Sequence, residues 1–307
     1  MQARLAGTAL VTLIILVVLS PQIALSQEGE FPTLKGHYLG QVPPGMEPRL
    51  FARGIVSHPD YRTYTYVFLP NGNECVFDYY GDNEYKDGAL FTTRLEDGKW
   101  IEPVPAGLFA GIDNVFLPRV SPDGETWFFT STSLEMPEGV EGKTPLFYIR
   151  KDGTGWTEPR YLTQAIHASA TEDGKVYYMV EGRDGSYPGF RQPLKGGYGD
   201  LEWCQPRDYF GGDMAHLVVA PDESYMIFDS EKRPRVGECR LHVSFRKADG
   251  TWTMPMSLGS LIELKASMAW ISPDGKYIFF KAYDDVYWVD AGIVEKIKPK
   301  GITAKKK

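Results

Sequence analysis

A turn of the type Ser-Pro-Asp-Gly recurs five times in strict or altered form along this 307-residue chain, and successive copies begin 52, 50, 49 and 52 residues apart. Proline presets the first corner of such a turn, aspartate bonds back to its own backbone, and glycine accepts a positive φ. A short apolar or aromatic segment follows each copy, as at residues 277–280. A repeat of this length without helical periodicity predicts stacked β-units. The copies begin at Leu69, Ser121, Thr171, Ala220 and Ser272.

Each repeat contains enough further segments for a four-stranded sheet. A third strand-like segment, as at 146–150, leads through a glycine hairpin to a Trp-x-x-Pro element, which begins at Trp100, Trp156 and Trp252 and has a shorter relative at Trp203. Proline is tolerated on edge strands, so this element is expected at the outer rim. A sheet with two apolar faces needs neighbours, and radial stacking supplies them. The sequence therefore predicts an all-β fold, a single β-propeller of five four-stranded antiparallel blades.

Two details refine this prediction. Glu172 replaces the proline of the third turn and Glu223 replaces the glycine of the fourth, so both turns are expected to be less ideal. Residues 45–55 resemble the rim element at 102–112, whereas the last repeat has no Trp-x-x-Pro of its own. We therefore expect the N-terminal segment to complete the last blade and close the ring.

The two ends of the chain differ from the repeats in composition. Residues 5–19 are almost wholly apolar but shorter than the roughly 20 residues that span a bilayer, and small residues follow at Ala24 and Ser26. This pattern predicts a signal peptide over 1–26, cleaved near Ser26/Gln27, and a periplasmic or secreted protein; a retained anchor is the alternative. The propeller is expected over 27–295. The lysine-rich end predicts a basic disordered tail over 296–307.

Charge and cysteine content narrow the partners. The net charge is −7 although the tail is basic, and an acidic body does not suit a nucleic-acid backbone. We expect a monomer that binds a protein or glycan, with no transmembrane segment after cleavage. Three cysteines leave at least one unpaired. Cys204 and Cys239 can pair if their strands adjoin, and Cys75 is interpreted as a buried thiol.

The repeat also resembles a known family. The stretch Ser-Pro-Asp-Gly-Lys-Tyr-Ile-Phe-Phe at 272–280 resembles the TolB-like, WD-like propeller repeat of exported bacterial proteins. The opening at 38–45, followed by Gly-Ile-Val-Ser at 54–57, is similar to uncharacterised exported bacterial propellers. The resemblance implies a propeller but no particular activity, because propellers host many unrelated functions. TolB itself has six blades, so a degenerate sixth unit within residues 28–64 is the alternative to five.

Aligning the repeats on their turns places residues at equivalent positions. The strand before the turn is innermost in such propellers, so alternate residues face the central channel. Five residues before the proline position are Thr65, Leu117, His167, His216 and Met268. His167 and His216 are therefore expected to lie close together on neighbouring blades. Eight residues after the proline position are Asp78, Thr130, Val180, Asp229 and Lys281.

A group of channel residues forms the candidate binding site: His167, His216, Asp78, Asp229, Arg119, Trp270 and Tyr66. Imidazole is a common metal ligand, so His167 and His216 are weak candidates for a divalent metal. Oligogalacturonate lyases, which resemble this architecture, use a histidine cluster with such a metal. Two histidines make only half a site. The simpler interpretation makes the histidines channel or core residues and the carboxylates turn caps that meet solvent. We assign no catalytic residue and expect no cofactor.

Several classes of function lack their sequence motifs in this chain. The sequence has no GxSxG nucleophile elbow, no P-loop, no dinucleotide fingerprint and no cysteine-rich metal signature. Nearly every patterned residue has a structural explanation, which favours an exported propeller that binds a protein or glycan through one face without catalysis. One alternative is a carbohydrate-active enzyme, lyase or hydrolase, with its site at the channel mouth. Another is a structural subunit of an envelope complex.

Overall fold

The computed structural model describes residues 31–81, 88–182, 185–206, 209–234 and 236–302. The chain divides into two compact units, Met1–Pro32 and Thr33–Lys307, of which the second contains the repeats. The predicted signal peptide, 1–26, lies outside the described residues. Within the described ranges, no helix has both the length and the apolar character needed to cross a membrane.

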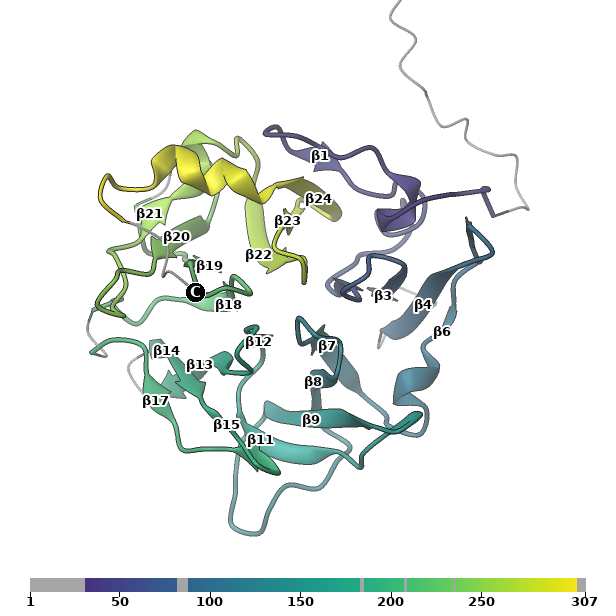
Figure 1. The fold of residues 1–307 in the computed structure, drawn as a ribbon, viewed down its shortest axis with the longest axis horizontal. Coiled ribbons are helices and arrows are strands. Elements are labelled where there is room, and N and C mark those ends of the chain that lie inside the picture. Colours follow the sequence, from purple (N-terminus) through teal and green to yellow (C-terminus); the bar gives the residue numbers. More distant parts are fainter. Residues whose placement is uncertain (1–30, 82–87, 183–184, 207–208, 235, 303–307) are drawn as a thin grey trace, which may run out of the picture. The chain divides into compact units, whose positions relative to one another are not determined.

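The second unit is a five-bladed β-propeller, as the sequence predicted (Figure 1). Blade 1 consists of β2 (Tyr66–Phe68), β3 (Glu74–Tyr79), β4 (Ala89–Glu96), β5 (Lys99–Trp100) and β6 (Val104–Pro105). Blade 2 consists of β7 (Val115–Val120), β8 (Thr126–Ser131), β9 (Pro145–Asp152), β10 (Gly155–Trp156) and β11 (Arg160–Gln164). Blade 3 consists of β12 (Ala168–Ala170), β13 (Val176–Gly182), β14 (Gly185–Arg191) and β17 (Glu202–Trp203), with a side hairpin of β15 (Pro193–Leu194) and β16 (Gly197–Tyr198).

The last two blades close the ring. Blade 4 consists of β18 (Ala215–Val219), β19 (Tyr225–Asp229), β20 (Leu241–Phe245) and β21 (Met256–Ser257). Blade 5 consists of β22 (Ala266–Ile271), β23 (Tyr277–Ala282), β24 (Asp285–Asp290) and β1 (Arg49–Leu50). The strands within each blade pair antiparallel. Short 3-10 helices complete the described chain: η1 (Tyr38–Gly40), η2 (Gly107–Phe109), η3 (Leu258–Ser260) and η4 (Ala291–Ile297).

The recurring turn has the hydrogen bonds that its sequence predicts. Asp123 accepts the hydroxyl of Ser121 at 2.5 Å and the backbone N–H of Glu125 at 2.9 Å, while Gly124 has a φ of 77°. The aspartate thus holds the corner and the glycine supplies the left-handed residue. Every residue of the following strand, β8, is buried, because neighbouring blades cover both of its faces.

The N-terminal segment closes the ring as expected. Arg49 pairs with Trp288 and Leu50 with Tyr287, which makes β1 the outermost strand of blade 5. Phe51 then packs at the seam between blades 5 and 1, with its ring centroid 5.1 Å from that of Phe279 and 5.6 Å from that of Phe68. The segment considered for a sixth blade therefore supplies a strand to the fifth.

The tryptophan elements differ from the prediction in detail. Trp100 lies on the hairpin strand β5, and the outer strand β6 begins only after the proline that ends the Trp-x-x-Pro element. Trp100 and Trp252 are buried, whereas Trp203 is 41% exposed. In blades 1, 2 and 4 the outermost strand therefore follows the Trp-x-x-Pro element. In blade 3 the tryptophan itself lies on the exposed edge strand, β17.

The two altered turns keep the hydrogen bond of the others, and the fourth is less ideal in backbone conformation, as expected. The N–H of Gly174 donates to Thr171 at 2.9 Å, and the N–H of Glu223 donates to Ala220 at 2.8 Å. Glu223 itself takes the left-handed conformation, with a φ of 60°. Both oxygens of its buried carboxylate lie 2.8 Å from the Lys175 ammonium, and glycine could not form this ion pair.

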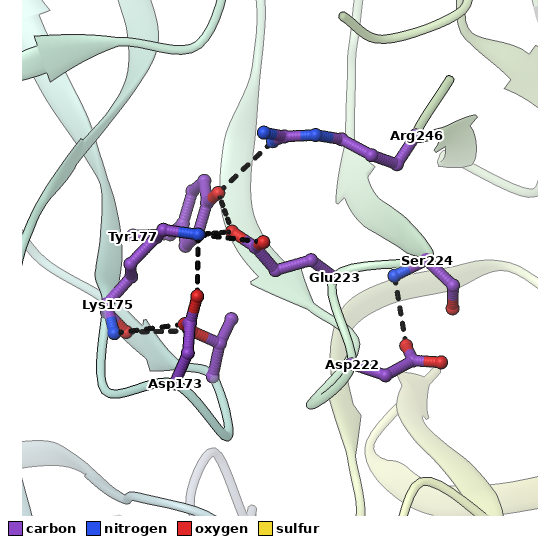
Figure 2. A network of polar contacts seen from close by, with 8 residues as sticks. Asp173, Lys175, Tyr177, Asp222, Glu223, Ser224 and Arg246 are labelled. Carbon is purple, nitrogen blue, oxygen red and sulfur yellow. Dashed lines mark hydrogen bonds and ion pairs between the residues drawn. The ribbon is translucent and has the colours of Figure 1, made fainter. Parts of the chain in front are cut away.

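Figure 2 shows this network across the seam between blades 3 and 4. Lys175 lies between Glu223 and Asp173, and its ammonium is 2.7 Å from the Asp173 carboxylate. The hydroxyl of Tyr177 donates to Glu223 and accepts from Arg246 at 3.3 Å. Buried charges need such partners, so the network offsets the cost of placing Glu223 at the seam.

The structure describes part of the predicted C-terminal tail and all three cysteines. The predicted boundary at residue 295 falls inside η4, and the partly buried Ile297 and Ile302 pack against the core of blades 4 and 5. Residues 303–307 lie outside the described residues. Cys204 and Cys239 form no disulfide, and Cys75 is a buried free thiol.

Candidate functional site

The inner strands of three blades are interrupted at the same repeat position. The register shifts between Phe116 and Arg119 in β7, between Ala215 and Val218 in β18, and between Ser267 and Trp270 in β22. The residues five before the proline position in these blades all have left-handed backbones, with φ of 50°, 49° and 52° for Leu117, His216 and Met268. Bulges of this kind redirect side chains, and the strands that contain them, β7, β18 and β22, surround the centre of the ring (Figure 1).

His167 and His216 lie side by side, as the repeat alignment predicted. Their ring centroids are 4.7 Å apart and the ring planes are inclined at 50°. The two residues differ in environment despite their equivalent positions. His167 directly precedes β12 and is buried, whereas His216 is on a bulge and its side chain is 28% exposed. His216 is therefore the accessible member of the pair.

Asp229, at the end of β19, fixes the orientation of His216. The Nδ1–H of His216 donates to the carboxylate, with the two oxygens at 2.8 and 3.0 Å. The same carboxylate accepts the backbone N–H of Met268 from blade 5 at 3.2 Å. Because Nδ1 is engaged by this bond, Nε2 is the ring nitrogen of His216 that remains for another partner.

His167 has an unpaired polar atom. Its Nε2 is buried and has no hydrogen-bond partner among the described residues. Burial, and secondarily the positive charge of Arg119 and the neighbouring His216, hold the pKa of His167 well below its usual value. The ring is therefore neutral near pH 7. An unpaired buried nitrogen is uncommon and calls for a physical explanation.

Asp78 occupies the position of Asp229 in blade 1 but has different partners. One carboxylate oxygen accepts the backbone N–H groups of Tyr64 and Thr65 at 2.7 and 2.9 Å. Burial raises the pKa of Asp78 to about 6, although these hydrogen bonds act to lower it. Asp78 and Asp229 are both buried, so the simpler interpretation that these strand-end carboxylates meet solvent is wrong.

Arg119 and Tyr66 connect Asp78 of blade 1 with the histidine pair and Asp229 of blades 3 and 4. Arg119 is buried, donates from Nη1 to the carbonyl of Pro118 at 2.9 Å, and interacts electrostatically with Tyr66, Asp78 and His167. The hydroxyl of Tyr66 donates to the carbonyl of Met268 at 2.5 Å. Six of the seven predicted residues thus form one group, here called the axial cluster: Tyr66, Asp78, Arg119, His167, His216 and Asp229.

The seventh residue, Trp270, lines a cavity among the inner strands. Trp270 is buried, and this cavity, which Arg119 also lines, has a volume of about 20 Å³ within blades 2 to 5. A cavity of that size holds about one water molecule. A ligand larger than water does not fit this cavity. The partly exposed side chain of His216 and the residues around it are here called the channel mouth.

Lys281 and Tyr64 are neighbours of the cluster that the sequence did not single out as site residues. Nζ of Lys281 lies 3.7 Å from the ring centroid of Tyr64, which packs edge to face on Tyr80 at 5.2 Å. Lys281 shares its repeat position with Asp78 and Asp229, so the alignment contained a signal for it. Tyr64 had no such signal. It lies just before β2, and the inner strands of the blades do not all begin at the same position in the repeat.

The axial cluster offers few donor atoms to a divalent metal. Within the described parts of the chain, no three His, Cys, Asp or Glu side chains are arranged to hold a metal ion. The guanidinium of Arg119 adds a positive charge close to His167. Two imidazoles in such a field make a poor cation site.

The solved structures that resemble this chain do so at low similarity. No protein-family model matches the sequence, and no curated protein matches it. A gluconolactonase from Xanthomonas campestris is 13% identical with a TM-score of 0.44, covering 84% of this chain and 94% of its own. A puromycin-hydrolysing peptidase from Mycobacterium tuberculosis is 15% identical with a TM-score of 0.42, covering 78% of this chain and 38% of its own. A Dyadobacter fermentans protein of unknown function is 12% identical with a TM-score of 0.41, covering 79% of this chain and 96% of its own. At this level of similarity, no activity is carried over.

Proposed function

We propose that this chain is a binding propeller that takes a glycan at the channel mouth, without catalysis. The observation that carries the proposal is the pairing of His216, oriented by Asp229 and partly exposed, with the unpaired Nε2 of His167 beside it. Buried polar groups are satisfied by protein, by water or by a ligand. A sugar hydroxyl, which donates and accepts, suits the accessible imidazole of His216.

The surroundings of the mouth support a sugar over a purely apolar ligand. Tyr64 and Tyr80 contribute aromatic surface near Lys281, whose side chain is only 8% exposed. Ligand sites combine such apolar faces with a few fixed polar groups. The small axial cavity limits the ligand to the mouth, so a chain end or a side branch of a glycan fits the proposal better than a threaded polymer.

A titration against neutral, acidic and amino-sugar tetrasaccharides tests this proposal. We expect saturable binding of at least one, weakened about tenfold or more in His216→Ala because a desolvated hydrogen bond is lost. His37→Ala removes an exposed histidine outside the axial cluster and serves as the matched control. Binding that is equal in both variants, or absent from the whole panel, would contradict the glycan proposal.

A lyase or hydrolase acting at the same mouth is the second candidate. The Asp229–His216 pair favours it, because a carboxylate on Nδ1 leaves Nε2 placed to accept a proton from a substrate. The test is an assay for new reducing ends or unsaturated products from the same tetrasaccharides. Product that disappears in His216→Ala would support the enzyme and overturn the non-catalytic proposal.

Export and a protein partner are separate proposals from the sequence. Residues 1–26 support cleavage near Ser26/Gln27 and a periplasmic or secreted site of action. N-terminal sequencing of the mature protein from cell fractions tests this, and a start at Met1 in the cytosol would contradict it. A specific partner captured from envelope extracts would instead favour the envelope-subunit alternative.

A further inference from the structure

A second and larger cavity lies where the N-terminal segment crosses the turns of blades 1 and 5. Its volume is about 460 Å³, within the range of about 300–1,000 Å³ that is usual for small-molecule sites. Residues 35–43 form one wall, and the turns of blades 1 and 5 form the other, with Pro70, Asn71, Asp274 and Lys276 among them. None of its lining residues belongs to the axial cluster. We call it the closure cavity.

The N-terminal wall of this cavity is held rigidly. The backbone N–H of Tyr38 donates to the Gly72 carbonyl at 3.0 Å, and Nδ1–H of His37 donates to the Asn71 carbonyl at 2.9 Å. The indole of Trp100 donates to the Gly36 carbonyl at 2.7 Å. A site that is ordered before binding loses less conformational entropy when a ligand enters.

The same wall contains backbone conformations that side chains rarely adopt. Tyr38 and Leu39 have φ of 51° and 56°, and Gly40 follows with a φ of 67°. A Cβ on Gly40 would lie 2.5 Å from the backbone oxygen of Lys35, so the loop closes tightly on itself. Left-handed non-glycine residues cluster at ligand sites, where surrounding contacts hold the strain.

The charges around the cavity leave one cation in excess. Asp274 accepts the hydroxyl of Ser272 at 2.6 Å and pairs with the Lys276 ammonium at 3.1 Å, so these opposite charges neutralise each other. Lys35 makes no ion pair with any residue that the structure describes. Burial and the nearby Asp274 raise the pKa of Tyr38, which keeps its phenol neutral. The chemistry therefore suits a ligand with a single negative charge.

Flat apolar groups supply the rest of the lining. The rings of Tyr38 and Tyr277 meet edge to face, with centroids 5.1 Å apart at 79°. Tyr277 also lies 4.9 Å from Trp288, and Pro43 and Pro70 complete the apolar surface. Aromatic faces and proline rings favour a planar ring in a ligand, through stacked or edge-to-face contact.

We propose that the closure cavity binds a small aromatic carboxylate, with its ring against Tyr277 and its carboxylate at Lys35. Such a ligand contacts the N-terminal segment on one side and blade 5 on the other. Binding therefore links the two parts that close the ring and raises the resistance of the propeller to unfolding. This site is independent of the glycan site proposed at the channel mouth.

Titration with 1-naphthoate, with calorimetry and thermal unfolding as the two readouts, tests the proposal. We expect saturable binding, an upward shift of the unfolding temperature, and weaker binding of the uncharged 1-naphthamide. Lys35→Met should weaken naphthoate binding about tenfold but leave naphthamide binding unchanged, because only the charge-assisted contact is lost. Lys195→Met, which removes an exposed lysine of the β15–β16 hairpin, is the matched control.

Tyr277→Ala should weaken both probes, because it removes ring contact rather than charge. The proposal is overturned if naphthoate shows no saturable binding, or if Lys35→Met and Tyr277→Ala bind it as tightly as Lys195→Met does. His216→Ala should leave naphthoate binding intact, and Lys35→Met should leave glycan binding intact. The two sites can therefore fail separately.

Discussion

Asp78 in blade 1 and Asp229 in blade 4 occupy the same position in the repeat, yet they act on different partners. Asp78 uses one oxygen to hold two backbone N–H groups of its own blade. Asp229 holds the side chain of His216 and a single backbone N–H from the next blade. One carboxylate therefore secures the inner strand, whereas the other orients a side chain that solvent can reach. Position in the repeat does not decide whether a residue serves the fold or the site.

The largest expected effect concerns stability on the blade 1 side. Asp78→Ala leaves the buried N–H groups of Tyr64 and Thr65 without an acceptor and should lower the free energy of unfolding by about 3 kcal/mol. Chemical denaturation measures this loss. Asp60→Ala, at a side chain that is 77% exposed, is the control. A loss no greater than that of the control would mean that Asp78 does not secure the strand.

The pH dependence of stability should separate Asp78 from His167. The folded pKa of Asp78 is about 6, above its unfolded value of 3.8, so the folded state binds the extra proton and stability falls as pH rises from about 4 to 6. The contribution is at most about 3 kcal/mol. The folded pKa of His167 is depressed, so its contribution is present above about 6.5 and is lost as pH falls.

Denaturation of wild type, Asp78→Asn and His167→Leu between pH 4 and 7 measures the two contributions. Relative to wild type, Asp78→Asn should lose stability toward low pH, and His167→Leu should gain it. Curves that run parallel for all three proteins would show that neither group titrates differently on folding.

A smaller effect, on binding, should arise on the blade 4 side. Asp229→Ala frees the imidazole of His216 to rotate and should weaken glycan binding about tenfold, because the ring is no longer held in place. It should cost less stability than Asp78→Ala, since only one backbone N–H is left unpaired. Calorimetry and denaturation on the same preparations check both statements. The reverse ranking would invert the comparison between the two carboxylates.

The smallest expected effect is a gain in stability. His167→Leu replaces a buried ring with an unpaired Nε2 by an apolar side chain of similar size, and should raise the free energy of unfolding by about 1 kcal/mol. The same variant should bind glycan more weakly than wild type. A stability gain without any loss of binding would mean that His167 does not take part in the site.

The repeat made much of this predictable. The turn spacing gave five blades, and alignment on the turns brought His167 and His216 together because equivalent positions on adjacent blades are neighbours in a ring. The left-handed bulges at Leu117 and Met268 have no local sequence signal, since leucine and methionine normally avoid that conformation. The use of Glu223 as an ion-pair partner depends on Lys175 of another blade, which single-turn reasoning does not reach.

Imidazole ¹⁵N spectra of His167 and His216, recorded with and without the best-binding tetrasaccharide, test the central claim most directly. The account predicts that Nε2 of both rings shifts on saturation while the backbone amides of Tyr64 and Thr65, held by Asp78, do not. Unchanged Nε2 signals at saturating glycan would contradict it and place the binding surface elsewhere.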